Sequence, residues 1–197
     1  MQQVGAGVLE EAPEDEIETS KHCHYTPHHA VIKEDKTTTK LRVVLDGAAK
    51  SSKFDFAIND CLSKGPNLLA SLFAVLLRFR LFKVPVLADI EKAFLQVCIH
   101  EDDIDSMRIL WYKDVSKSRE IAVFRYLRVV FGFICSPFLQ NATIRLHLTR
   151  CLDKVETNEE GDFLRLLLQS FYVDDLKLSV PTTGEAERLI EFSQFVH

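Results

Sequence analysis

The chain has 197 residues, of which 47% are hydrophobic, and a formal net charge of −5. This length is enough for one large domain, or for a domain with part of a second, built around a buried core. Charged residues interrupt every apolar stretch before about 18 residues, and the first residues have no basic start, so the sequence predicts neither a membrane span nor a signal peptide. Five scattered cysteines without a C-x-x-C pair indicate reduced thiols and an intracellular protein.

The charge is distributed unevenly along the chain. Residues 1–20 hold six acids and no lysine or arginine, whereas the remainder holds 24 bases and 23 acids. We expect residues 1–24 to form an acidic, loosely ordered lead-in. Residues 21–56 hold seven bases against four acids. This basic segment could face phosphate, and a solvated charged surface explains the same charges equally well.

The first half of the chain predicts strands around one helix. Residues 25–46 have the pattern of a β-hairpin with a long polar loop. Pro66 opens a predicted helix over 66–81 with one apolar face. A short apolar strand, 84–90, follows and carries Asp89 near its end. A helical turn and then the strand pair "DSMRILWY" and "IAVFRYLRVV" come next.

The second half predicts helices around one hairpin. Ser136 and Pro137 begin a helix, a polar loop covers 152–161, and "DFLRLLLQS" is helical. The hairpin "FYVDDLKLSV" at 171–180 precedes a last helix. This order of elements predicts an α+β fold with an antiparallel sheet packed on helices.

Three acids stand at the ends of predicted strands. Asp174 and Asp175 are adjacent in the turn of the 171–180 hairpin, and Asp89 ends a strand about 85 positions earlier. Neighbouring carboxylates repel one another, so a cluster of all three needs cations. Two Mg²⁺ ions roughly 4 Å apart would relieve that repulsion and could activate a hydroxyl and stabilise a leaving phosphate. Spacing alone leaves a second interpretation open, that of two unrelated acidic turns.

Two other groups of residues could bind ligands. Trp111 and Tyr112 could stack on a base or pack in the sheet. A dense histidine and cysteine cluster could bind zinc, although no paired downstream ligands stand at zinc-finger spacing. Its members are His22, Cys23, His24, His28 and His29.

Four motifs in order resemble those of reverse transcriptases. The segments are "PHHAVIKEDKTTTKLRVVLDGAAKS" at 27–51, "LADIEKAFLQV" at 87–97, "FGFICSPFLQNA" at 131–142 and "YVDD" at 172–175. The phrases "TTTKLRVVLD", "INDCL", "GPNLL" and "LLRFR" look most like the Bel/Pao group of LTR retrotransposons. Four ordered motifs are more specific than "YVDD" alone.

The resemblance implies the fold of a right-hand polymerase. Residues 25–83 would form a fingers-like segment, and residues 84–197 the palm with its antiparallel sheet and catalytic hairpin. The chain ends about 22 residues after Asp175, so we expect the thumb and RNase H segments to be absent. The chain would then be a fragment of a pol polyprotein or a truncated copy of the element.

The resemblance also implies the chemistry of the acids. Asp89 and Asp174 would hold two Mg²⁺ ions, or Mn²⁺, and Asp175 would complete the site. The protein would be an RNA-directed DNA polymerase, a nucleotidyltransferase in which a primer 3′-hydroxyl attacks the α-phosphate of a dNTP. Its partners would be an RNA or DNA template with primer, dNTPs and the rest of the polyprotein, with no membrane. An active element would place it in a cytoplasmic virus-like particle.

Five further residues match positions near the incoming nucleotide in that family. Phe94 matches an aromatic steric gate against the ribose 2′-hydroxyl, or is a core residue. Arg42, and less directly Lys40, match a fingers position that meets the triphosphate, or are solvated hairpin charges. Phe131 and Gly132 match residues near the base and primer–template, where a glycine lets the backbone approach closely; a turn glycine is the alternative.

Three functional hypotheses follow. The first is a working polymerase domain, in which all three acids persist. The second is a catalytically weak or inactive palm-fold remnant that binds nucleic acid or protein. The third is a two-metal nuclease or phosphatase built from the same acids. The Phe94 position and the Ser136-Pro137 box favour polymerase over nuclease.

Overall fold

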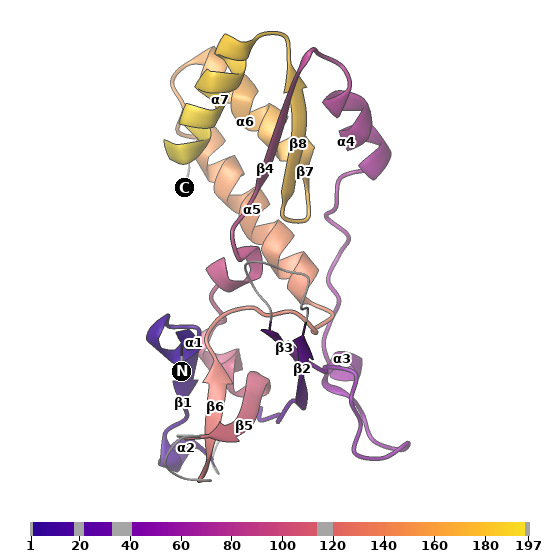
Figure 1. Ribbon diagram of the computed structural model, residues 1–197, viewed down its shortest axis with the longest axis vertical. Helices are drawn as coiled ribbons and strands as arrows, with labels where there is room; N and C mark the ends of the chain where they lie inside the picture. The colour runs from indigo at the N-terminus through magenta and orange to yellow at the C-terminus, as the bar shows by residue number, and fades with distance from the viewer. Residues whose placement is uncertain (1, 18–21, 33–40, 114–119, 196–197) are drawn as a thin grey trace. The chain divides into compact units, whose positions relative to one another are not determined.

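The structure is a computed structural model that describes residues 2–17, 22–32, 41–113 and 120–195 (Figure 1). The chain divides into two compact units. Unit 1 consists of Met1–Gly65 and Phe94–Ser136, and unit 2 of Pro66–Ala93 and Pro137–His197. The fold is α+β, with antiparallel sheets packed on helices, as the order of elements predicted. In the described part of the chain, no helix is long and apolar enough to cross a membrane.

Unit 1 contains two antiparallel sheets. In the larger sheet β1 (Leu9–Glu11) and β5 (Arg108–Tyr112) flank β6 (Ile121–Tyr126). The smaller sheet is the predicted hairpin of β2 (His28–Ile32) and β3 (Leu41–Leu45). Unit 1 also has short helical segments: α1 (Gln2–Gly5), α2 (Glu14–Ile17), α3 (Ile58–Cys61), the 3-10 helix η2 (Glu101–Met107) and, from its second residue on, the 3-10 helix η1 (Ala93–Gln96).

The core of unit 1 brings both sheets and the segment after β6 together. Its buried members are Val8, Leu45, Ile58, Met107, Ile109, Phe124, Tyr126, Val130 and Phe133. Val8 belongs to the acidic N-terminal segment, so that segment contributes an apolar side chain to the core.

The described part of the N-terminal segment is regular, where we expected a loosely ordered lead-in. Strand β1 pairs antiparallel with β6, with Leu9 opposite Tyr126 and Glu11 opposite Phe124. The physical reason is a set of ion pairs with buried arginines. Arg125 donates from Nε to Glu10 Oε1 at 2.6 Å and also pairs with Glu16. The acidity of this segment therefore neutralises internal cations.

Asp105 is the centre of the same network. Its carboxylate accepts hydrogen bonds from Arg108 Nε at 2.9 Å and from Arg125 at 3.2 Å. The Arg108 side chain is fully buried, and its other nitrogens donate to the backbone carbonyls of Glu16 and Ile17. Burial alone would lower the pKa of Arg125, but its hydrogen bonds to three carboxylates outweigh burial and raise that pKa.

Unit 2 is one antiparallel sheet covered by helices. Its strands are β4 (Val84–Asp89), β8 (Asp175–Val180) and β7 (Phe171–Tyr172), in the order β4-β8-β7. Its helices are α4 (Leu72–Phe79), α5 (Ser136–Leu152), α6 (Asn158–Ser170) and α7 (Thr183–Phe195). The predicted hairpin at 171–180 and the strand before Asp89 are confirmed.

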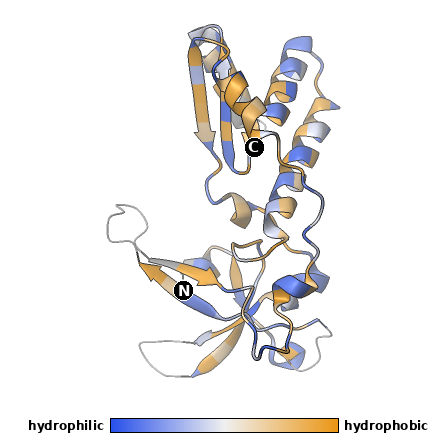
Figure 2. Ribbon diagram, turned by 90° about the vertical axis from the view of Figure 1, so that its right-hand side faces the viewer, coloured by the Kyte–Doolittle hydropathy of each residue, from blue (hydrophilic) through white to orange (hydrophobic). Residues whose placement is uncertain are grey.

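The sheet of unit 2 buries one face. Side chains at the start of β8 alternate, so that Leu176 and Leu178 are buried while Asp175 and Lys177 are half-buried, and at its end Ser179 and Val180 are both buried. The buried residues of β8 share a core with leucines of three helices: Leu148 of α5, Leu164 and Leu167 of α6, and Leu189 of α7. Figure 2 shows how hydrophobic and hydrophilic residues are distributed along the strands and helices.

Two helices differ in length from their predictions, for local reasons. The helix expected over 66–81 is shorter, because the Asn67 side chain accepts a hydrogen bond from the Leu69 amide and holds the entry non-helical. Helix α6 begins at Asn158 instead of 162. Thr157 caps it by accepting from the Glu160 amide, and the Glu160 carboxylate accepts from the Thr157 hydroxyl.

We predict that Asp105→Ala lowers the free energy of unfolding by about 3 kcal/mol or more, since it leaves two buried guanidinium groups short of a carboxylate. Urea denaturation would measure the change. Asp103→Ala is the matched control, because Asp103 lies exposed in the same 3-10 helix and should change stability by less than about 0.5 kcal/mol. Equal stability of the two variants would contradict the network.

Candidate functional site

The register of two strands brings the predicted acids together. Strands β4 and β8 run antiparallel with Asp89 directly opposite Asp175. The Ile90 amide continues the pairing by donating to the Asp174 carbonyl at 3.1 Å. Directly opposite residues in an antiparallel pair project to the same face. The sheet therefore places Asp89 beside the tip of the hairpin, as we predicted from the strand ends.

A strained turn forms that tip. Tyr172 pairs with Asp175, so Val173 and Asp174 are the two residues of the loop. Val173 has φ +59°, a left-handed conformation that is unfavourable for a β-branched residue. A positive φ at the first of two loop residues is the feature of a type II′ turn, which normally selects glycine there. Such strain costs about 1–3 kcal/mol and persists only where the surrounding structure holds it.

The three carboxylates form a compact cluster. Asp89, Asp174 and Asp175 each offer one oxygen, and these oxygens all lie within 4.8 Å of one another. Asp89 is exposed, and the other two are half-buried. Within the described residues, this is the one grouping of three or more histidine, cysteine or acidic ligands. Clustered hard oxygen donors fit a divalent cation such as Mg²⁺ or Mn²⁺.

A lysine that sequence reasoning missed contacts this cluster. Lys177 Nζ forms an ion pair and hydrogen bond with Asp175 Oδ2. The signal was present in the sequence, since residues two apart on a strand point to the same face. The hairpin thus carries one cation of its own next to the acids.

The residues expected near the nucleotide base contact one another in unit 1. Phe94 is buried, with 4% of its surface exposed, and Phe131 is 65% exposed. Their ring centroids lie 4.3 Å apart at 59°, a tilted aromatic pair. This contact fits both a core role for Phe94 and the support of an exposed aromatic surface. The gate role of Phe94 therefore stays a prediction.

Gly132 occupies a position that only glycine fits. Its φ is +107°, and a Cβ there would clash with the Leu45 carbonyl oxygen. The close approach seen in this chain is thus to the backbone of β3. The proposed approach of Gly132 to primer–template stays a prediction.

Asn59 also holds the segment that contains Gly132, a role that the sequence did not predict. Its Nδ2 donates to the Gly132 carbonyl at 2.9 Å, and its Oδ1 accepts from the Ile134 amide at 2.9 Å. Its own amide donates to the Gly47 carbonyl at 3.0 Å. One asparagine therefore joins the "DGAAK" segment to the "FGFIC" segment by three hydrogen bonds.

The two cations expected to meet the triphosphate are Arg42 and Lys40. Arg42 lies on β3 with its backbone opposite Val31. Lys40 falls outside the described residues. Their contact with a triphosphate stays a prediction.

The histidine and cysteine cluster does not form a ligand set among the described residues. His28 packs its ring against Trp111 at a centroid distance of 4.9 Å. Trp111 remains 41% exposed, so its two interpretations, packing and stacking on a base, both stay open. Burial lowers the pKa of His24.

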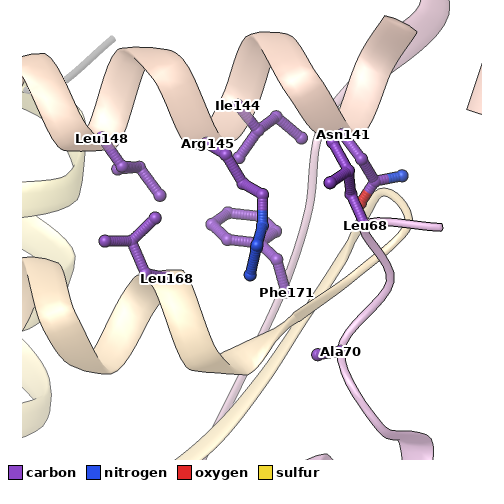
Figure 3. A pocket seen from close by; sticks show the side chains of 8 residues that line it. All are labelled: Leu68, Ala70, Asn141, Ile144, Arg145, Leu148, Leu168 and Phe171. Carbon is purple, nitrogen blue, oxygen red and sulfur yellow. The ribbon is translucent and has the colours of Figure 1, made fainter. Parts of the chain in front are cut away.

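A pocket in unit 2 is lined by residues of α5, of α6, of the start of β7 and of the segment before α4 (Figure 3). Helix α5 contributes Arg145, which points into the pocket, and Phe171 enters from the start of β7. The remaining lining residues are mostly apolar: Leu68, Ala70, Asn141, Ile144, Leu148 and Leu168. None of these lining residues is acidic.

Solved structures share this fold with the chain. A foamy viral protease–reverse transcriptase in complex with double-stranded DNA is 20% identical, with a TM-score of 0.64, covering 98% of this chain and 27% of that chain. A selenomethionine-labelled mutant of the Prototype Foamy Virus protease–reverse transcriptase is 19% identical, with a TM-score of 0.65, covering 98% of this chain and 20% of that one. The native form of that enzyme is 18% identical, with a TM-score of 0.62 and the same coverages of 98% and 20%.

These likenesses establish a reverse transcriptase fold, and at such identities they establish the fold alone. The chain spans between 20% and 27% of the length of these structures. No protein-family model and no curated protein matches the sequence.

We predict that Asn59→Ala lowers the free energy of unfolding by about 1–2 kcal/mol, because two side-chain hydrogen bonds are lost. Asn59→Asp should cost at least as much, since a carboxylate would then face the Gly132 carbonyl. Urea denaturation measures both variants. Lys64→Ala is the control, because Lys64 is exposed, and its effect on the free energy of unfolding should be close to zero.

Proposed function

We propose that the chain is the fingers and palm part of an RNA-directed DNA polymerase from a Bel/Pao-type LTR retrotransposon. The observation that carries the proposal is the cluster of Asp89, Asp174 and Asp175 within 4.8 Å, on neighbouring strands of a reverse transcriptase fold. The four ordered motifs support the family, and the phrases such as "INDCL" support the group. Residues 25–83 would be the fingers-like segment and residues 84–197 the palm, and the chain would be part of a longer pol polyprotein.

The chemistry would be phosphoryl transfer. The primer 3′-oxygen forms a bond to the α-phosphorus of a dNTP, the bond from that phosphorus to pyrophosphate breaks, and the hydroxyl proton is lost to solvent. Two divalent cations held by the three carboxylates would activate that hydroxyl and stabilise the leaving pyrophosphate. The contribution of the chain itself is to fix Asp89 by strand pairing and Asp174 by the strained turn at Val173.

The remaining residues would position the substrates. Arg42 suits a triphosphate because a guanidinium binds phosphate in a bidentate manner, and Lys40 is a second candidate. Phe94 would exclude the ribose 2′-hydroxyl, while Phe131 and Gly132 would lie near the base and primer–template. The likeness to a foamy virus enzyme in complex with double-stranded DNA supports a primed RNA or DNA template as the partner.

We predict that the folded chain extends oligo(dT) on poly(rA) weakly with Mg²⁺ or Mn²⁺. Asp89→Asn and Asp174→Asn should each reduce extension by about 100-fold or more, since each removes charge from the metal site while keeping the shape of the side chain. Asp153→Asn is the control, because this acid is exposed at the end of α5. Absence of extension with either metal by a folded chain would favour the inactive remnant that binds nucleic acid or protein.

We predict that Phe94→Ala raises the ratio of ribonucleotide to deoxynucleotide incorporation by about tenfold or more, because the clash with the 2′-hydroxyl is lost. Incorporation of each nucleotide from single-nucleotide reactions measures this ratio. The ratio is independent of the fraction of active protein, which matters because truncating a buried phenylalanine also costs about 3–5 kcal/mol of stability. Phe94→Tyr keeps the ring and should keep the selectivity. An unchanged ratio in Phe94→Ala would assign Phe94 to the core alone.

A further inference from the structure

We propose that Lys177 is a positioning residue that holds Asp175 and weakens the binding of divalent cations by the acid cluster. The inference rests on the proposed function, because it concerns the same three carboxylates. It adds a residue that controls how readily the site is filled. It does not depend on the identity of the template.

The geometry places Lys177 on the face of the sheet that carries the acids. Lys177 and Asp175 are two apart on β8, and their partners across the pair are Leu87 and Asp89. Residues two apart on a strand share a face. The Lys177 side chain is 27% exposed and Asp175 is 49% exposed, so the ion pair is partly shielded from water. Leu87, directly opposite, is 64% exposed and offers an apolar neighbour to the lysine stem.

The charges divide the three acids into two kinds. Asp175 has an ammonium group in direct contact. Among the described residues, neither Asp89 nor Asp174 forms an ion pair with a lysine or arginine. Three carboxylates and one ammonium leave a formal charge of −2, which one divalent cation balances. A first cation would therefore be held by Asp89 and Asp174, and the Lys177 ammonium competes with a second cation for the Oδ2 atom of Asp175.

The direction of the effect follows from two contributions. Removing the ammonium frees the Asp175 oxygen as a ligand, and it also removes a positive charge that repels the cation. Both contributions strengthen cation binding. Because the site is partly exposed, solvent screens each of them, and together we expect a gain in affinity of about tenfold.

The experiment measures Mn²⁺ binding to the full chain by the loss of the free Mn²⁺ signal in electron paramagnetic resonance. Lys177→Met keeps the apolar stem and removes the charge, so its Kd for Mn²⁺ should fall by about tenfold. Lys177→Arg keeps the charge and should bind like the unaltered chain. Lys83→Met is the matched control, because Lys83 is exposed next to the other end of β4, about 20 Å of strand away from Asp89. An unchanged Kd in Lys177→Met would overturn the inference.

A double-mutant cycle tests whether Lys177 acts through Asp175. In the Asp175→Asn background, Lys177→Met should gain less than the full tenfold, because the oxygen that it would free is gone. An equal gain in both backgrounds would overturn the pairing and leave only a general charge effect.

The two proposals fail in different ways. Mn²⁺ binding that Asp89→Asn and Asp174→Asn leave unaltered would show that the cluster holds no metal, and the proposed function would fall. Binding that both changes abolish, with no response to Lys177→Met, would overturn only the role of Lys177. Far-UV circular dichroism on every variant confirms that the chain is folded.

Discussion

The register between β4 and β8 is the constraint on which the acid site depends. A slip of β4 by one residue would turn Asp89 to the opposite face and move the buried Val86 out of the core, and the same slip of β8 would turn its own apolar side chains out. Leu176, Leu178 and Val180 are buried under the helices, so hydrophobic packing resists that slip. The charged face is thus positioned by the packing of the apolar face. The close approach of the three carboxylates, which repel one another, is therefore maintained by apolar residues on the other face of the sheet.

The chain handles clustered charge in two different ways. In unit 1, Arg108 and Arg125 are buried, and carboxylates and backbone carbonyls satisfy them from several elements. That arrangement is fixed, because a buried unpaired charge is costly. In unit 2, the three clustered acids lie exposed or half-buried, and among the described residues Asp175 is the one of the three that forms an ion pair, with Lys177. Carboxylates that are only partly neutralised by the protein can still bind cations. Carboxylates that are fully paired with buried arginines instead stabilise the fold.

Sequence patterns predicted those features that depend on near neighbours or on strong periodicity. The hairpin at 171–180 and the strand ending at Asp89 were evident from apolar runs interrupted by acids, and the site followed from placing strand ends together. The start of α6 was not predicted, because residues 152–161 are polar and were interpreted as a loop. Thr157 and Glu160 nevertheless have the spacing of a capping box. The order of the N-terminal segment could not be predicted, since Glu10 is 115 positions from Arg125. Asn59 and Lys177 were missed because their roles depend on which backbone or carboxylate lies beside them.

Strand β1 has a consequence for how this protein can be handled. It covers one side of β6, whose other side is covered by β5. A version of the chain shortened to remove its acidic start would expose the hydrogen-bonding edge of β6, a strand that contains Phe124 and Tyr126. An uncovered apolar edge is a template for pairing between molecules. The segment that looks most dispensable by hydropathy is therefore the one that guards this sheet against self-association.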